Sequence, residues 1–136
     1  MINQKIITSG KRKTAIAKAR IKEGTGKVTI NKIPYLNLKS MFHVLLIREP
    51  LDLAKEVLGE LKFDITVTIA GGGTESQVEA ARLAIAKAIV EFTKSPEVKK
   101  AFLEYDRNML VADTRRKEPY KPGDSKARSK RQKSYR

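Results

Sequence analysis

Hydrophobic and polar residues alternate along two stretches of this chain. In residues 63–69 every second side chain is apolar, and Asp or Thr stands between them. Residues 14–21 alternate in the same way, with alanine and isoleucine on one face. A period of two predicts strands with one packed face and one partly wet face. Two short β-branched stretches, 3–9 and 27–30, predict two more strands, and a turn at 23–26 predicts that 27–30 pairs antiparallel with 14–21.

Elsewhere the apolar residues recur at helical spacing. Residues 34–47 predict a short buried helix, and Pro50 favours the start of a second helix, since proline is well suited to the first helical position. The most regular pattern predicts a helix over 75–92, opened by a capping box of the Thr-x-x-Gln type at Thr74. Cap, proline and acid at 95–97 predict the start of a further helix. Strands and helices together indicate one small α+β domain over residues 1–113.

The pattern ends at residues 114–136, which hold ten Lys/Arg, two acids and three apolar or aromatic side chains besides two prolines. Such a segment buries too little apolar surface to offset its ordering entropy, so we expect an extended basic tail that orders against a polyanion. A merely solubilising tail is the alternative. Five of the ten cations are arginine, which grips phosphate with two donors, and this favours nucleic-acid binding.

The net charge of +14 is concentrated at the two ends of the chain. Residues 1–22 carry seven Lys/Arg and no acid, whereas residues 23–113 carry twelve Lys/Arg and thirteen acids. Folding does not require this segregation, which is typical of a nucleic-acid footprint. There is no cysteine, no apolar stretch typical of a signal peptide near the start, and no run approaching the ~18 apolar residues of a membrane span. We therefore expect a soluble, intracellular protein.

Three constellations are candidates for chemistry. The first is a basic turn before the strand at 14–21, whose wet face adds two further cations; its members are Lys11, Arg12, Lys13, Lys18 and Arg20. A solvated surface is the alternative. The second is the triple glycine at 71–73, which fits a phosphate at a helix start or a flexible turn, but matches neither a P-loop nor a dinucleotide fingerprint. The third is a pair of tyrosines within the basic tail, which are suited to stacking on bases: Tyr120 and Tyr135.

Catalytic and metal sites are not expected. His43, the single histidine, lies in an apolar stretch and is predicted to be a core or rim residue. With no cysteine, no zinc site with recognisable spacing can be assembled. Nothing in the sequence brings Asp64, Asp106 and Asp113 together as paired carboxylates. We predict no cofactor, no metal and no enzymatic activity; the alternatives are a free-standing RNA- or DNA-binding module such as an RNA chaperone and, more weakly, a phosphotransfer enzyme that uses the triple glycine.

Several motifs, in order along nearly the whole chain, carry a resemblance to a known family. They are GKRKTA at 10–15, AKAR at 17–20, GKVTIN at 26–31, EPL at 49–51, GGG at 71–73 with Gln77, AAR at 80–82, AIA at 84–86, DTRRKE at 113–118, SKAR at 125–128 and KRQKSYR at 130–136. The chain resembles the ninth protein of the small ribosomal subunit. The QKSYR ending resembles the archaeal and eukaryotic branch.

The resemblance implies a mixed four-stranded sheet backed by helices with a left-handed βαβ crossover, in the head of the small subunit of cytoplasmic ribosomes. It implies contacts with small-subunit rRNA in the 3′ major domain and with neighbouring head proteins, but no membrane and no obligate homo-oligomer. The rRNA-binding residues it implies are Lys11, Arg12, Lys13, Lys18, Arg20, Gly71, Gly72, Gly73, Arg115, Arg116, Lys117, Lys126 and Arg128. The end of the tail would contact the anticodon loop of peptidyl-site tRNA through Arg131, Lys133, Tyr135 and Arg136.

Overall fold

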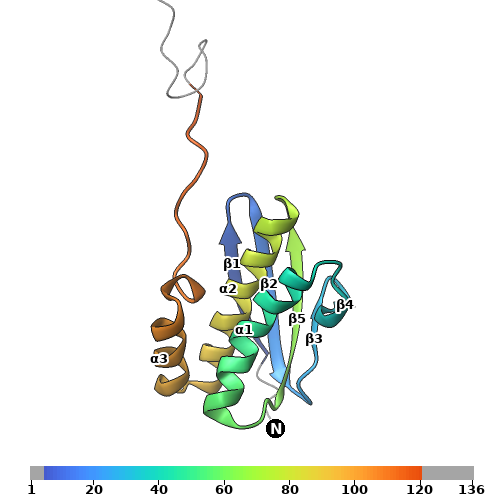
Figure 1. Cartoon of the computed structure of the whole chain (residues 1–136), viewed down its shortest axis with the longest axis vertical. Helices are drawn as coiled ribbons and strands as arrows, with labels where there is room; N and C mark the ends of the chain where they lie inside the picture. The colour runs from blue at the N-terminus through green and yellow to red at the C-terminus, as the bar shows by residue number, and fades with distance from the viewer. Residues whose placement is uncertain (1–4, 121–136) are drawn as a thin grey trace, which may run out of the picture.

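One mixed β-sheet runs through the protein; two helices cover one of its faces, and a third helix packs beside those two (Figure 1). The computed structural model describes residues 5–120. The strands, in the sheet order β1-β2-β5-β3-β4, are β1 (Ile6–Arg12), β2 (Ala15–Glu23), β5 (Phe63–Ala70), β3 (Val28–Ile30) and β4 (Ile33–Pro34). The helices are α1 (Met41–Leu58), α2 (Thr74–Thr93) and α3 (Pro96–Tyr105), with short 3-10 turns η1 (Tyr35–Asn37) and η2 (Arg107–Met109).

The predicted pairing of the second and third strands is wrong, because β5 lies between them. β2 pairs antiparallel with β1 on one side and with β5 on the other. β5 matches β2 along eight positions, from Ile16 opposite Ala70 to Glu23 opposite Phe63. β3 has three residues and pairs parallel with β5. The longer strand therefore takes the position beside β2 that the turn at 23–26 had suggested for β3.

The connection from β3 to β5 is a left-handed crossover. In Figure 1 the helices face the viewer, both strands point upward, and the chain leaves β3, passes through α1 in front of the sheet and enters β5 on the left of β3. The predicted α+β fold with a mixed sheet backed by helices is thus confirmed. The sheet has a fifth strand beyond the four predicted, the two-residue β4 at its edge.

Helix α2 lies unusually close to β1 and β2, because small residues face it from both strands. Ala15, Ala17 and Ala19 of β2 are fully buried. On β1, a Cβ added to Gly10 would lie 2.3 Å from the carbonyl oxygen of Ala80, so this position admits only glycine. The Thr8 hydroxyl donates a hydrogen bond to the Ala84 carbonyl oxygen over 2.8 Å. The alternating small residues that predicted a strand therefore also set the distance to the helix.

Helix α1 is continuous where two helices were predicted. Pro50 lies within it and is fully buried. A proline inside a helix removes one hydrogen bond and normally favours an end or a kink. Here the buried positions before and after Pro50 form one stripe of His43, Ile47, Pro50, Leu51 and Ala54. Packing of this single apolar stripe outweighs the local preference of proline.

One predicted turn and one predicted helix cap differ from the structure. β1 continues through Arg12, so the turn consists of Lys13 and Thr14, with Lys13 in the left-handed region at φ 53°. The capping box at Thr74 does not form, because Gly73 is the N-cap and Thr74 is already helical. The Gln77 side-chain amide instead donates to the Gly71 carbonyl oxygen at 3.0 Å.

Within residues 5–120 no helix is both long and apolar enough to cross a membrane.

Candidate nucleic-acid interface

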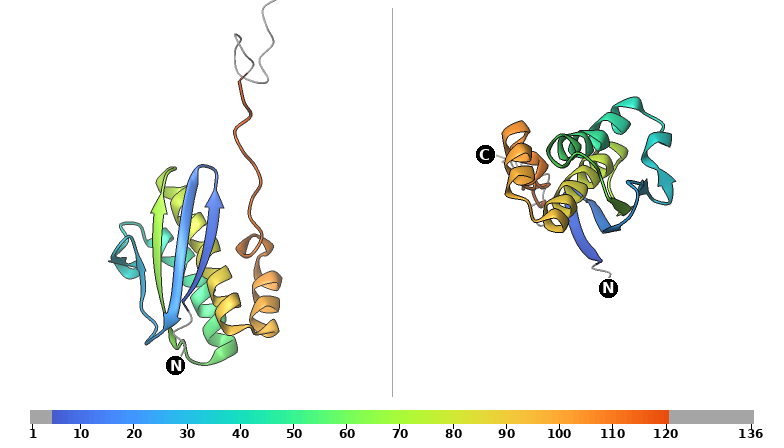
Figure 2. Two further views of the ribbon diagram at one scale, coloured as in Figure 1. Left: turned by 180° about the vertical axis from the view of Figure 1, so that it is seen from behind. Right: turned by 90° about the horizontal axis from the view of Figure 1, so that it is seen from below.

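The face of the sheet opposite α1 and α2 is open in the described part of the chain, as Figure 2 (left) shows. The alternation of β2 places Lys18 and Arg20 on this face, and both are exposed as predicted. Their cross-strand neighbours are uncharged: Lys18 lies between Ser9 and Thr68, and Arg20 between Ile7 and Thr66. Hydroxyl groups beside cations match the hydrogen-bonding needs of a nucleic-acid backbone.

Asp64, near the start of β5, also lies on this face, but it forms no ion pair with the cations of the face. One carboxylate oxygen accepts the backbone amides of Lys27, Thr25 and Gly26 at 2.9, 3.0 and 3.1 Å. The hydrogen bond from the Lys27 amide, supported by the other two amides, lowers the pKa of Asp64 below its usual value of 3.8. This acid therefore closes the β2–β3 turn and serves the fold.

The triple glycine lies against the β1–β2 turn. Gly71 and Gly72 have positive φ values of 78° and 68°, which disfavour other residues. A Cβ on Gly71 would lie 2.7 Å from the Thr14 carbonyl oxygen, and one on Gly72 would lie 2.8 Å from Ala15 Cβ. Gly71 and Gly72 are thus required for close backbone packing, which favours the structural reading of this motif. Gly73 has open space beside it and precedes α2.

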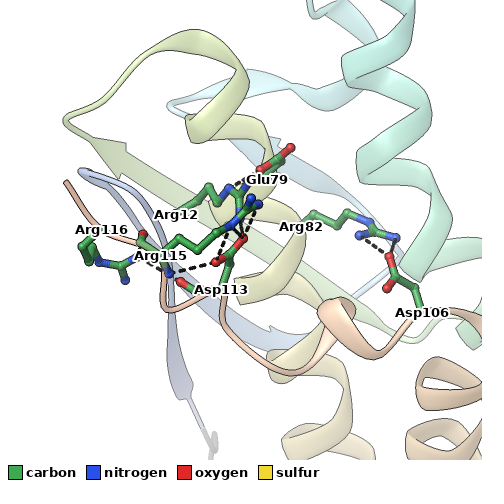
Figure 3. Close-up of polar contacts among 7 residues, drawn as sticks. All are labelled: Arg12, Glu79, Arg82, Asp106, Asp113, Arg115 and Arg116. Atoms are coloured by element: carbon green, nitrogen blue, oxygen red, sulfur yellow. Dashed lines mark hydrogen bonds and ion pairs between the residues drawn. The ribbon is translucent and has the colours of Figure 1, made fainter. Parts of the chain in front are cut away.

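Residues 113–117, which we call the tail root, are fixed to the end of β1 by Asp113. The Arg12 guanidinium forms ion pairs with Asp113 and, at 2.7 Å from its Nε, with Glu79 of α2 (Figure 3). Arg115 donates from Nε and Nη2 to the same Asp113 carboxylate at 2.9 and 2.8 Å. Arg116 donates to the Asp113 backbone carbonyl at 2.9 Å. Arg12 was predicted from sequence to bind RNA, but its guanidinium group is engaged in these ion pairs within the protein.

A basic hollow forms where the two charged ends of the sequence meet. It has a volume of about 550 Å³, and five of its six lining residues are cationic: Arg12, Lys13, Thr14, Arg115, Arg116 and Lys117. We call this the basic hollow. Cations that are far apart in sequence converge here because Asp113 holds the tail against the β1–β2 turn. An opening of this size and charge suits phosphate groups.

A second polar network, which the sequence did not indicate, holds the segment leading to the tail. Arg82 of α2 pairs with Glu49 of α1 at 2.6 Å and with Asp106 at 3.3 Å. The Tyr105 hydroxyl donates to Glu49 at 3.3 Å, and the negative charge of Glu49 raises the pKa of Tyr105. The Asp106 side chain also caps η2 by accepting a hydrogen bond from the Asn108 backbone amide. The network joins α1, α2 and α3 beneath the tail root.

The remaining predicted site residues divide into two groups. Lys11 is exposed on β1, and Lys117 lies in the tail root with its Nζ 4.6 Å from the centre of the exposed Tyr120 ring. Residues 114–120 have neither helix nor strand and are exposed at every position, as an extended tail requires. The residues that lie outside the described part of the chain are Lys126, Arg128, Arg131, Lys133, Tyr135 and Arg136.

The acids and the histidine show no catalytic arrangement in residues 5–120. Asp64, Asp106 and Asp113 each belong to a different network. His43 is buried at the rim of the core, as predicted, with its Nε2 3.0 Å from Glu75. No group of three His, Cys, Asp or Glu that could hold a metal occurs in this part of the chain.

Comparison with known proteins agrees with the resemblance read from the motifs. A family model described as ribosomal protein S9/S16 matches residues 10–136. The small ribosomal subunit protein uS9 of Methanococcus vannielii is 50% identical over 131 residues, which cover 95% of this chain and 96% of that protein. The uS9 proteins of two strains of Methanococcus maripaludis, C5 and C7, are 50% identical with the same coverage. The chain belongs to the ribosomal protein S9/S16 family.

Proposed function

We propose that this protein is a structural component of the small ribosomal subunit in the cytoplasm, that its basic surfaces bind small-subunit rRNA, and that the end of its tail contacts peptidyl-site tRNA. The observation that carries the rRNA proposal is the convergence of the β1–β2 turn and the tail root on the basic hollow. Family membership and the names of the archaeal relatives support the ribosomal setting.

Two surfaces of the described domain bind rRNA, the basic hollow and the open face of the sheet. The basic hollow receives phosphates through Lys13, Arg115, Arg116 and Lys117, while Arg12 holds its wall in place through Asp113. The open sheet face contributes three cations, Lys11, Lys18 and Arg20, and the last two lie beside threonine hydroxyls on β5. Gly73 at the start of α2 leaves room for a backbone to approach, and Gly71 and Gly72 keep that end of α2 next to the turn. Lys126 and Arg128 continue the phosphate contacts along the tail.

The tRNA contact follows from the same chemistry and from the family resemblance. Arg131, Lys133, Tyr135 and Arg136 place three cations and one aromatic hydroxyl near the end of the tail. Cations that meet phosphates position a nucleic acid without reading its bases, as a site visited by every tRNA requires. Tyr135 supplies either stacking or a hydroxyl hydrogen bond.

The salt dependence of rRNA affinity tests the proposal. If about six tail charges meet phosphates, the log–log salt slope of the full chain is about 4 to 5 units steeper than that of a chain ending at Asp113. Binding is measured on the 3′ major domain of small-subunit rRNA, with circular dichroism to verify that the shorter chain is folded. Equal slopes for the two chains would exclude the tail from rRNA binding.

A further inference from the structure

An apolar surface lies exposed on the edge of the molecule formed by β4, η1 and the start of α1. We call it the apolar edge, and it consists of Ile33, Leu36, Met41, Phe42 and Leu45. Met41 and Phe42 are each 78% exposed, although the sequence pattern predicted a buried helix here. Scattered exposed hydrophobic residues are normal, but a contiguous group marks an interaction site.

The geometry of α1 explains why these residues remain outside. Met41, Phe42 and Leu45 are spaced i, i+1 and i+4 and so share one side of the helix. His43 and Ile47 project from the other side and are buried. A helix start that is apolar on both sides can bury only one of them in its own domain. The other side is left for a partner.

The apolar edge lies away from the nucleic-acid surfaces. In Figure 1, β4 and the start of α1 are at the right of the sheet, whereas α3 and the tail are at the left. The view from below in Figure 2 (right) also separates these two edges. In the sheet order, β4 is at the opposite end from β1, which forms part of the basic hollow. Both surfaces can therefore be occupied at once.

The charges around the apolar edge are positive. Residues 32–48 contain three cations and no acid. Arg48 has a loose partner, Asp52, at 3.5 Å, and within residues 5–120 neither Lys32 nor Lys39 has a carboxylate within ion-pairing distance. The nearby Glu75 is oriented toward His43 at 3.0 Å. A partner with carboxylates around its own apolar surface complements this rim.

We propose that the apolar edge is the docking surface for a neighbouring protein of the small ribosomal subunit, one whose apolar contact surface is bordered by acidic residues. A second copy of this chain is disfavoured, since the two cationic rims and net charges of +14 would face each other. Nucleic acid is disfavoured because four of the five side chains are aliphatic or thioether groups with nothing to offer a phosphate. An added strand is disfavoured because β4 has two residues and Pro34 lacks an amide donor.

Site-specific crosslinking tests this inference, which rests on the proposed place of the chain in the small subunit. The photoreactive residue benzoylphenylalanine replaces Phe42 in the full chain, and in a control chain it replaces Leu103, which is exposed on α3. Both chains are assembled into small subunits, which are then irradiated. We expect the Phe42 position, but not the Leu103 position, to crosslink to one ribosomal protein at a peptide that combines apolar and acidic residues.

The outcomes separate the two proposals. A chain that never co-sediments with small subunits overturns the proposed function and this inference with it. A chain that enters subunits but crosslinks from position 42 to rRNA, to its own copy or to nothing overturns the inference alone.

Charge reversal tests the stated chemistry of the partner. With benzoylphenylalanine at position 45, Lys32→Glu together with Lys39→Glu is expected to reduce the crosslink yield about tenfold, as loss of important interface contacts does. The matched control, Lys99→Glu with Lys100→Glu on α3, leaves the yield unchanged. An undiminished yield for the Lys32/Lys39 chain would show that the partner is not acidic at this contact.

Discussion

Arg12 at the end of β1 and Asp113, which directly precedes the basic tail, form an ion pair that joins the two basic ends of the chain. Their side chains are only 21% and 19% exposed, so the pair is shielded from solvent on most sides. The acid also binds Arg115 and, through its backbone, Arg116. The Asp113 carboxylate thus holds two guanidinium groups together, those of Arg12 and Arg115, and its backbone carbonyl holds a third, that of Arg116.

This pair should contribute measurably to stability. In a double-mutant cycle with Arg12→Gln and Asp113→Asn, we expect a coupling free energy of about 1–2 kcal/mol, because both charges are partly desolvated. The exposed pair Arg48–Asp52, at 3.5 Å, is the control and should show about 0.3–0.5 kcal/mol. Urea unfolding of the single and double variants supplies the values. A coupling no larger than in the control pair would mean that Asp113 does not fix the tail root.

The basic hollow should account for part of the salt dependence of rRNA binding. Changing Arg115, Arg116 and Lys117 to glutamine removes up to three phosphate contacts, which should make the salt slope about 2 to 3 units shallower. The control changes Lys99, Lys100 and Arg107 to glutamine, which alters the net charge equally at exposed residues of α3 and η2 that do not line the hollow. Filter binding from low to moderate salt measures both. Identical slopes for the two triple variants would remove the hollow from the interface.

The end of the tail should affect tRNA binding but not the assembly of the protein into small subunits. Deleting Arg136 is expected to weaken peptidyl-site tRNA binding to purified small subunits by a few-fold, because one charge-assisted contact of about 1 kcal/mol is lost. The content of this protein in those subunits, measured by mass spectrometry, should not change. Unaltered tRNA affinity would count against the contact.

Close packing of α2 on β1 makes Gly10 intolerant of any side chain. Gly10→Ala should destabilise the fold by about 1–3 kcal/mol or more, since the new methyl group would meet backbone atoms of Ala80 and Ala84. Ser9→Ala, one residue earlier on the open face, should change stability by less than about 0.5 kcal/mol. Thermal unfolding of both variants is the measurement, and comparable losses would contradict the close approach.

Asp64 should make stability depend on pH in acid. Its pKa is lower in the folded protein than in the unfolded chain, so its contribution is fully present above pH 3.8 and is lost as the pH falls through the folded value. Asp64→Asn should be less stable than the parent at neutral pH, and the difference should shrink below about pH 4. Urea unfolding between pH 7 and pH 2.5 tests this. A difference that is constant over the whole range would show that the carboxylate charge is not stabilised by the turn amides.

The local pattern of apolar and polar residues was sufficient to predict structure where the signal lies within one helix or strand. Alternation predicted the exposed Lys18 and Arg20 and the buried faces of β2 and β5. Periodicity predicted α2 to within one residue at each end, and cap, proline and acid predicted the start of α3. It failed where two elements compete for one place. β5 displaced β3 from β2 because it offers eight paired positions, and α1 continued through Pro50 because its packed stripe outweighs one missing hydrogen bond.

The sequence by itself determined that an almost neutral domain carries cations at both ends, because charge and composition are properties of the chain in any conformation. Only the tertiary structure decided which cations are available. It paired Arg12 with Asp113 and Glu79, brought Lys13 next to Arg115–Lys117, and left Met41 and Phe42 outside the core. These outcomes depend on distances between residues far apart in sequence, and those distances are set by the packing of α2 on the sheet and of the tail root on the β1–β2 turn.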